Sequence, residues 1–132
     1  ALFQAAIAEA RPGVRLECVS TVSACLERCR SLRRDHRVVA FVDMKLVGET
    51  GNDAIRGIRA DQRVAQVPIV MLSSSRRDDD ISSALMCGAN AFMTKPFSFG
   101  TLVDQLRVAS AFWFDGHRHP SSVVRAGSEG EN

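Results

Sequence analysis

The sequence predicts a doubly wound α/β fold, in which helices cover both faces of a parallel sheet. Short apolar runs of strand length occur at 38–42, 69–72 and 91–94, and they alternate with stretches of helical periodicity. A continuous apolar run is typical of a strand that is covered on both faces. Regular alternation of such strands with helices favours parallel pairing through right-handed crossovers. We therefore expect a single layered domain.

The other elements follow from local start and stop signals along the chain. Helix formers fill residues 1–10 before Arg-Pro-Gly, and Gly88 is typical of a residue that ends a helix. We expect further helices at 21–32, 52–60, 78–87 and 98–114, a strand at 15–19, and a loop that holds Gly48 and Gly51. Residues 115–132 are polar and rich in Gly, Ser and Pro, so we expect a mostly disordered tail there.

Length, charge and hydrophobicity favour a single globular domain. The chain has 132 residues, the size of one ordinary domain, with 17 Lys and Arg against 15 Asp and Glu. No basic stripe predicts a nucleic-acid partner, and no apolar run approaches the roughly 20 residues that cross a bilayer. The four cysteines lack the spacing of a tetrahedral metal site, so we expect reduced core residues and a cytoplasmic protein.

Three polar residues come directly after buried strands. Asp43, Ser73 and Lys95 each follow such a run, and in this architecture ligands bind beyond the carboxyl ends of the strands. A carboxylate can attack phosphorus if a cation neutralises the phosphoryl oxygens, and a hydroxyl can donate to one of those oxygens. Taken alone, Asp43 is better explained as a turn or cap residue. The three together favour a phosphate-accepting site, and no Gly-rich phosphate loop or nucleophile elbow predicts an enzyme for small molecules.

Three segments resemble the response-regulator receiver family over residues 1–114. VVAFVDMKLVGETG is similar to the family's third strand and phosphoacceptor loop, VPIVMLSSS to its fourth strand, and GANAFMTKPF to its fifth strand and Lys-Pro pair. The resemblance implies a flavodoxin-like (βα)5 fold with the parallel strand order 2-1-3-4-5. The family's first strand, with its acidic pair, has no counterpart in this sequence. We therefore expect a receiver domain that is incomplete at its N-terminus.

The resemblance also assigns roles to individual residues. It implies that Asp43 is the phosphoacceptor, that Ser73 is the switch hydroxyl and that Lys95 pairs with the phosphoryl group. It further implies a switching aromatic at Phe92, a cis peptide between Lys95 and Pro96, and a Mg²⁺ ion bound by Asp43 and the backbone carbonyl of Lys45. Catalysis would be limited to the domain's own phosphorylation and dephosphorylation.

The end of the last expected helix carries a narrower resemblance. ASAFWFDGHRHP is similar to stand-alone receivers that work with histidine kinases, including bacteriophytochromes. This implies a sensor histidine kinase as partner, and Phe112, Trp113 and Phe114 are candidates for a homodimer contact. Two alternatives stay open: a pseudo-receiver that binds partners without phosphorylation, and the receiver portion of a larger hybrid kinase or transcription factor.

Overall fold

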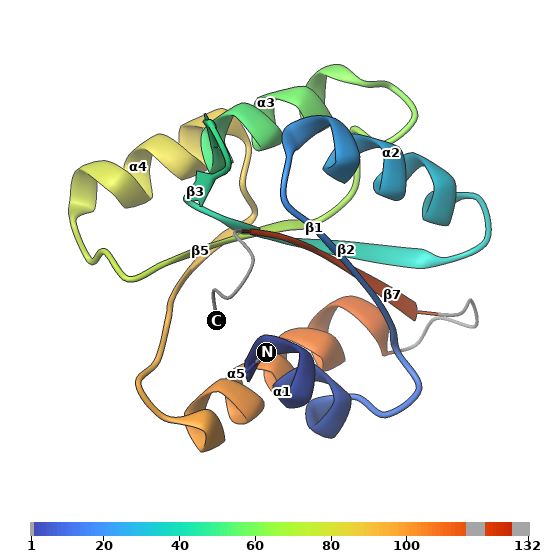
Figure 1. Ribbon diagram of the computed structural model, residues 1–132, viewed down its shortest axis with the longest axis vertical. Helices are drawn as coiled ribbons and strands as arrows, with labels where there is room; N and C mark the ends of the chain where they lie inside the picture. Colours follow the sequence, from blue (N-terminus) through green and yellow to red (C-terminus); the bar gives the residue numbers. More distant parts are fainter. Residues whose placement is uncertain (1, 116–120, 128–132) are drawn as a thin grey trace.

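The computed structural model describes residues 2–115 and 121–127, which form three layers around a parallel sheet (Figure 1). Helices α1 (Leu2–Ala10) and α5 (Phe99–Phe114) cover one face of the sheet. The other face carries α2 (Val22–Arg33), α3 (Gly51–Ala60) and α4 (Asp78–Cys87). This arrangement confirms the doubly wound α/β fold that the sequence predicts.

The central sheet has five strands in the order β1-β7-β2-β5-β6, and all of its pairings are parallel. The strands are β1 (Arg15–Val19), β2 (Arg37–Asp43), β5 (Ile69–Ser73), β6 (Ala91–Thr94) and β7 (Ser121–Ala126). Four of them match the expected strands to within one residue at either end. The carboxyl ends of β2, β5 and β6 therefore meet at one edge of the sheet.

The fifth strand corrects the prediction of a disordered tail over 115–132. Residues 121–126 form β7, which lies between β1 and β2 in the position that the strand order 2-1-3-4-5 gives to the missing first strand. The prediction failed because the average composition of the tail hides the short run Val123–Val124, and a buried parallel strand needs only a few apolar residues. The rest of the predicted tail, apart from Asp115 and Gly127, lies outside the described residues.

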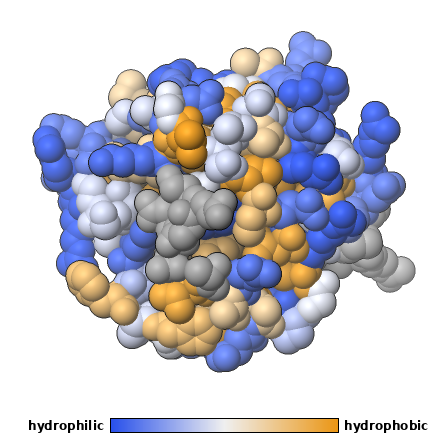
Figure 2. All heavy atoms as spheres, in the orientation of Figure 1, coloured by the Kyte–Doolittle hydropathy of each residue, from blue (hydrophilic) through white to orange (hydrophobic). Residues whose placement is uncertain are grey.

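Strand β7 joins the two apolar layers of the molecule. Val123 packs into the core under α1 and α5, whereas Val124 packs into the core under α2, α3 and α4. Both side chains are fully buried, because successive residues of a strand point to opposite faces of the sheet. The face of the molecule in Figure 2 carries both hydrophobic and hydrophilic residues. Because Val123 and Val124 belong to different cores, the loss of β7 would remove core packing from both faces of the sheet.

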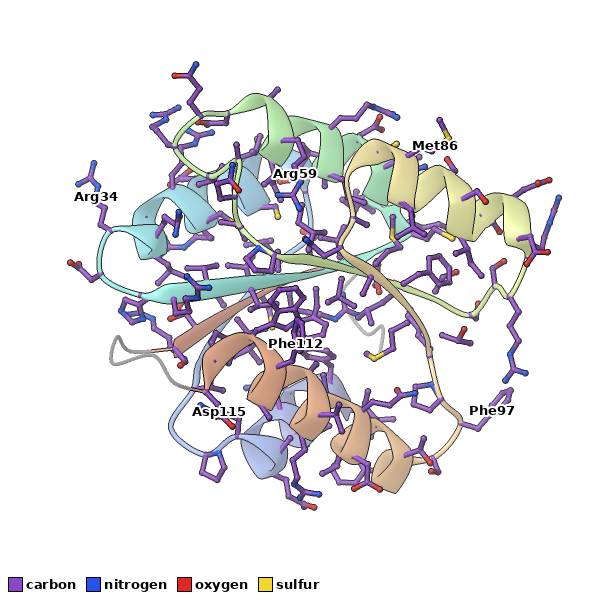
Figure 3. All side chains as sticks on the ribbon, turned by 180° about the vertical axis from the view of Figure 1, so that it is seen from behind. Arg34, Arg59, Met86, Phe97, Phe112 and Asp115 are labelled. Atoms are coloured by element: carbon purple, nitrogen blue, oxygen red, sulfur yellow. The ribbon has the colours of Figure 1, made fainter. Side chains whose placement is uncertain are left out.

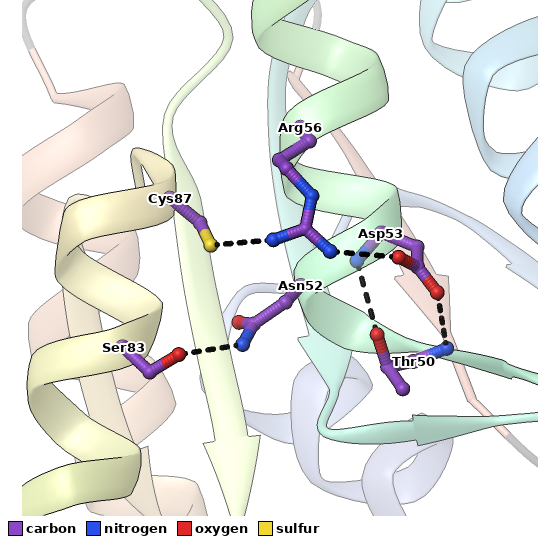
Figure 4. A network of polar contacts seen from close by, with 6 residues as sticks. All are labelled: Thr50, Asn52, Asp53, Arg56, Ser83 and Cys87. Carbon is purple, nitrogen blue, oxygen red and sulfur yellow. Dashed lines mark hydrogen bonds and ion pairs between the residues drawn. The ribbon is translucent and has the colours of Figure 1, made fainter.

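The segment after β2 is a small hairpin, where the sequence predicted only a loop. Strands β3 (Lys45–Leu46) and β4 (Glu49–Thr50) pair antiparallel, and Gly48 turns between them with a φ of 69°. Thr50 then caps α3, and the Thr50 backbone N–H donates to the Asp53 carboxylate (Figure 4). This hydrogen bond, followed by that from Arg56, lowers the pKa of Asp53. The cap fixes where α3 begins relative to the end of β2.

Polar side chains tie α3 to α4 and to the start of β5. The Asn52 amide donates to the Ser83 hydroxyl at 2.9 Å, and the Arg56 guanidinium donates to the Cys87 sulfur (Figure 4). Arg59 donates to the carbonyls of Val67 and Gly88 on either side of β5, and its partial burial lowers the pKa of its guanidinium. These contacts hold α3 and α4 together in the layer that covers one face of the sheet.

Helix length and the state of the cysteines can be compared with the sequence-based expectations. None of the described helices is long and apolar enough to span a membrane. All four cysteines are free thiols. Cys25 and Cys29 are fully buried in the core, as the sequence predicts, whereas Cys18 is exposed and Cys87 is only partly buried, which corrects the prediction for these two.

Replacement of Val124 by alanine tests whether β7 belongs to the core. Val124 is 0% exposed, so Val124→Ala should lower the free energy of unfolding by about 2 kcal/mol. Val47 is 61% exposed, and Val47→Ala is the matched control, with an expected change within about 0.5 kcal/mol. Urea unfolding followed by circular dichroism measures both. Equal, small effects in the two variants would contradict the central position of β7.

Candidate functional site

Asp43, Ser73 and Lys95 meet at the carboxyl edge of the sheet, as the strand-end rule predicts. Asp43 is the last residue of β2, Ser73 is the last residue of β5, and Lys95 follows β6. The Lys95 backbone N–H donates to the Ser73 carbonyl at 2.8 Å, which continues the pairing of β5 with β6. The ammonium group of Lys95 lies 3.3 Å from Oδ1 of Asp43. The predicted carboxylate and cation are therefore in direct contact.

A second cation, which the sequence did not lead us to expect, contacts the same carboxylate. Nη2 of Arg125 lies 3.0 Å from Oδ2 and 3.0 Å from Oδ1 of Asp43. Asp43 is 2% exposed and Arg125 is 5% exposed, so this ion pair is buried. One carboxylate thus faces two positive charges, of which the Lys95 ammonium is the more exposed.

The register of the sheet explains why Arg125 reaches Asp43. Arg125 pairs with Phe41 in the β7–β2 ladder, two residues before Asp43. Residues two apart on a strand share a face, so Phe41, Asp43 and Arg125 all lie on the face that α1 and α5 cover. On that face the Arg125 guanidinium also lies 5.1 Å above the ring of Phe3 in α1. A shift of β7 by one residue would turn Arg125 to the opposite face.

Gly127 closes over the carboxylate. Its backbone N–H donates to the Val19 carbonyl at 2.9 Å, which carries the chain across the end of the sheet. A Cβ at this position would lie 2.3 Å from Oδ2 of Asp43 and 2.1 Å from Nη1 of Arg125, so only glycine fits. The backbone of Gly127 therefore takes up the space directly beside one carboxylate oxygen.

The Ser73 hydroxyl makes its hydrogen bonds to neighbours other than Asp43. It donates to the Met44 sulfur at 2.9 Å and accepts from the Ser75 backbone N–H at 3.0 Å. Ser73 is 6% exposed, so the hydroxyl is nearly enclosed. The structure thus places Ser73 at the predicted edge, but in contact with the segment that leads to α4.

The two residues predicted to act with Lys95 have different outcomes. Phe92 on β6 is partly buried, packs against the core beneath α4, and lines a groove beside α5. The prediction of a cis peptide bond between Lys95 and Pro96 is wrong, because this bond is trans. Even before proline the trans isomer is favoured by about 0.5–1 kcal/mol.

The described residues do not fit a divalent cation at Asp43. Mg²⁺ prefers octahedral oxygen ligands and is usually held by one or two carboxylates. Here Arg125 and Lys95 lie against the carboxylate, and the described residues contain no cluster of three or more acidic, His or Cys side chains. Lys45, whose carbonyl was the other expected ligand, lies in β3 with an exposed side chain. The Arg125 guanidinium occupies the space next to both oxygens of Asp43, where a metal ion would have to bind.

The aromatic end of α5 divides into an exposed and a buried part. Phe112 is 74% exposed, and Figure 3 shows it on α5. The ring of Trp113 meets it edge-on at 4.6 Å. Phe114 is only 2% exposed, which corrects its assignment to a dimer contact, because its helical position turns it into the core against α1.

Sequence reasoning missed Arg125 and Gly127, although both contact the predicted acceptor. The available signal was the run VVRAG, in which two β-branched residues precede an arginine and a glycine. Such a run fits a short buried strand followed by a close backbone approach. Its distance along the chain from Asp43, 82 residues for Arg125, gave no reason to connect the two.

Known families and curated proteins that are similar to this chain are response regulators or their domains. The family model described as the response regulator receiver domain matches residues 3–107. The chemotaxis protein CheY of Pseudomonas aeruginosa is 33% identical over 64 residues, which cover 48% of this chain and 52% of that protein. A probable methanogenesis regulatory protein of Methanothrix harundinacea is 29% identical over 69% of this chain and 56% of that protein. The chain therefore spans about half the length of these curated relatives.

Solved structures share the fold. A response regulator in red light signalling of R. palustris superposes with a TM-score of 0.76 and 22% identity, over 90% of this chain and 88% of that one. The receiver domain of a sensor histidine kinase from Pseudomonas aeruginosa has a TM-score of 0.66 and 25% identity, over 85% and 84% of the two chains. That receiver was crystallised with a magnesium ion coordinated in its active-site cleft.

Replacement of Gly127 tests the closed arrangement around Asp43. Gly127→Ala places a methyl group against the ion pair, and we expect it to lower the free energy of unfolding by about 1–3 kcal/mol. Gly100 in α5 has nothing within 4 Å of an added Cβ, so Gly100→Ala should be neutral or stabilising by up to about 1 kcal/mol. Thermal unfolding of both variants gives the answer. A Gly127→Ala variant as stable as wild type would show that this segment does not lie on Asp43.

Proposed function

Because the chain belongs to the response regulator receiver domain family, we propose that it accepts a phosphoryl group on Asp43 from a sensor histidine kinase. The observation that carries the proposal is the 3.3 Å contact between the Asp43 carboxylate and the Lys95 ammonium at the ends of β2 and β6. Receiver domains are phosphoacceptor signalling modules, so the only chemistry proposed is the domain's own phosphorylation and dephosphorylation.

The described residues support three parts of the reaction. A carboxylate oxygen of Asp43 is the nucleophile, and the Lys95 ammonium neutralises charge on the transferred group. Ser73 lies at the same edge, where rotation of its hydroxyl would exchange its bond to Met44 for one to a phosphoryl oxygen. Gly127 must withdraw from Oδ2 before a phosphodonor reaches the acceptor, since Asp43 is 2% exposed.

Magnesium belongs to the family's chemistry, as the ion bound by the Pseudomonas receiver illustrates. When bound, such an ion neutralises phosphoryl oxygens and the acceptor carboxylate. The donor set around Asp43 does not fit it in the described conformation, so the proposed transfer relies on the chain's own cations.

One observation favours a second candidate function. The burial of Asp43 under Gly127 also suits a pseudo-receiver, which would bind its partner without phosphorylation. A receiver portion within a larger protein remains compatible with either chemistry, because the chain spans about half of its curated relatives. A cytoplasmic location and a stand-alone regulator of a phytochrome-type kinase are part of the leading proposal, and the resemblance of the α5 end supports them.

Substitution of the acceptor separates the two candidate functions. We expect wild-type protein incubated with acetyl phosphate and Mg²⁺ to gain one phosphoryl mass in intact-mass spectrometry, and Asp43→Asn to gain none, because an amide is not a nucleophile at neutral pH. Asp79→Asn is the matched control, since Asp79 is exposed at the start of α4 and should leave the adduct unchanged. Absence of the adduct from folded wild type would favour the pseudo-receiver.

The exposed face of α5 supports a homodimer as part of the same proposal. Phe112 and Val108, with exposures of 74% and 72%, border an apolar groove of about 730 Å³ between α5 and β6. A second copy would place the same apolar groups against this groove, as the self-complementary contact of a two-fold dimer requires. The groove is continuous with Phe92 and Trp113, so dimerisation would also cover the predicted switching aromatic.

Replacement of Phe112 tests this contact. Phe112→Ala should weaken dimerisation about tenfold or more if the ring is a central anchor of the interface. Phe97 is equally apolar and fully exposed but lies away from the groove, so Phe97→Ala is the matched control and should leave the dimer unchanged (Figure 3). Sedimentation equilibrium at micromolar concentration measures the constant. A wild-type monomer under these conditions would refute the dimer.

A further inference from the structure

We propose that Arg125 is the resident cation of the acceptor site and replaces the divalent cation there, so that phosphorylation of Asp43 proceeds without metal. The inference rests on the proposed phosphoacceptor function and identifies a further catalytic residue for that reaction. It starts from the disagreement between a metal ion and the donor set of the described residues, in which Nη2 of Arg125 lies 3.0 Å from both oxygens of Asp43.

The charges of the site match a phosphorylated aspartate without a metal ion. Before the reaction, the single negative charge of Asp43 faces the positive charges of Arg125 and Lys95. A phosphoryl group with the usual acidity carries a charge of about −1.5 to −2 near neutral pH. Arg125 and Lys95, the two cations that contact Asp43 among the described residues, carry a charge of opposite sign and similar size. A divalent ion added to them would instead concentrate positive charge in a buried site, where like charges repel strongly.

Arg125 is held in place by contacts that do not depend on the carboxylate. Its Nη1 donates to the Ala126 carbonyl at 2.9 Å, and its guanidinium lies 5.1 Å above the Phe3 ring. Its Nε is buried and has no hydrogen-bond acceptor among the described residues. A planar guanidinium with a spare donor suits bidentate binding of phosphoryl oxygens. The unsatisfied Nε therefore gives a phosphoryl group a favourable partner that the free carboxylate does not use.

The step balances with a small acyl phosphate as donor. A carboxylate oxygen of Asp43 attacks the phosphorus of acetyl phosphate, and a new oxygen–phosphorus bond forms. The bond from phosphorus to the acetyl oxygen breaks, and acetate leaves with the electron pair, so no proton has to move. Arg125 and Lys95 neutralise the phosphoryl oxygens during the transfer, which is the part that a metal ion would otherwise play.

The first arm of the test uses the unmodified chain. Wild type is incubated with acetyl phosphate in Mg²⁺ and, separately, in excess EDTA, and intact masses are followed over time. Rates within twofold of each other support the inference. An adduct that forms only with Mg²⁺ overturns the inference and leaves the phosphoacceptor function standing, whereas no adduct under either condition overturns both.

The second arm uses Arg125 variants in EDTA. Arg125→Gln should slow adduct formation about a hundredfold, and Arg125→Lys should restore only part of the rate, because it keeps the charge but lacks the planar guanidinium. Arg107→Gln is the matched control, since Arg107 is exposed and pairs only with Asp104 on the same helix among the contacts described. If Arg125→Gln does not fold, Arg125→Lys and the wild-type comparison decide. An unchanged rate in folded Arg125→Gln overturns the inference.

A direct binding measurement completes the design. Mn²⁺ is titrated into wild type and Asp43→Asn, and bound ion is followed by water-proton relaxation. The inference predicts the same weak signal in both proteins at millimolar Mn²⁺. Saturable binding in wild type that Asp43→Asn abolishes would show that a metal ion displaces Arg125, and would overturn it.

Discussion

The buried charge of Asp43 is the constraint on which the arrangement of this domain depends. A carboxylate that is 2% exposed is costly unless it is paired, and breaking a buried pair by removing one partner typically costs about 3–5 kcal/mol. The main partner comes from Arg125, 82 residues further along the chain. The folding of β7 into the sheet and the chemistry of the acceptor site are therefore linked through one ion pair, with Lys95 as the more exposed second cation.

The same strand also decides whether the sheet is continuous. β7 hydrogen-bonds to β1 on one side and β2 on the other, so without it β1 would be separated from the rest of the sheet. Its neighbouring valines, Val123 and Val124, belong to the cores under opposite helical layers. The register that buries both valines is the register that aims Arg125 at Asp43, because a shift by one residue would exchange the two faces.

Local patterns predicted the elements that have strong local causes. The strand at 91–94 and the approximate bounds of the helices followed from apolar runs, caps and glycine stops, and the strand-end rule brought Asp43 and Lys95 together correctly. The prediction failed for β7 because only two of its residues are large and apolar, and its stability comes from pairing on both sides. Arg125 could not be found for a related reason: its role depends on a long-range register that no local pattern encodes.

The hydrogen bonds of Ser73 show how a change at Asp43 can reach the surface. The Ser73 hydroxyl accepts from the Ser75 backbone, and the Ser75 hydroxyl in turn accepts from the Arg77 backbone and donates to Asp80 at the start of α4. If Ser73 turned to bind a phosphoryl oxygen, it would give up the Met44 contact and reorient the lone pairs that hold Ser75. Arg77 and Asp80 flank the first turn of α4, so the change in these hydrogen bonds would alter the position of the start of that helix. A small change in one buried hydroxyl would thereby alter an exposed surface, because each link in this chain of hydrogen bonds shares a residue with the next.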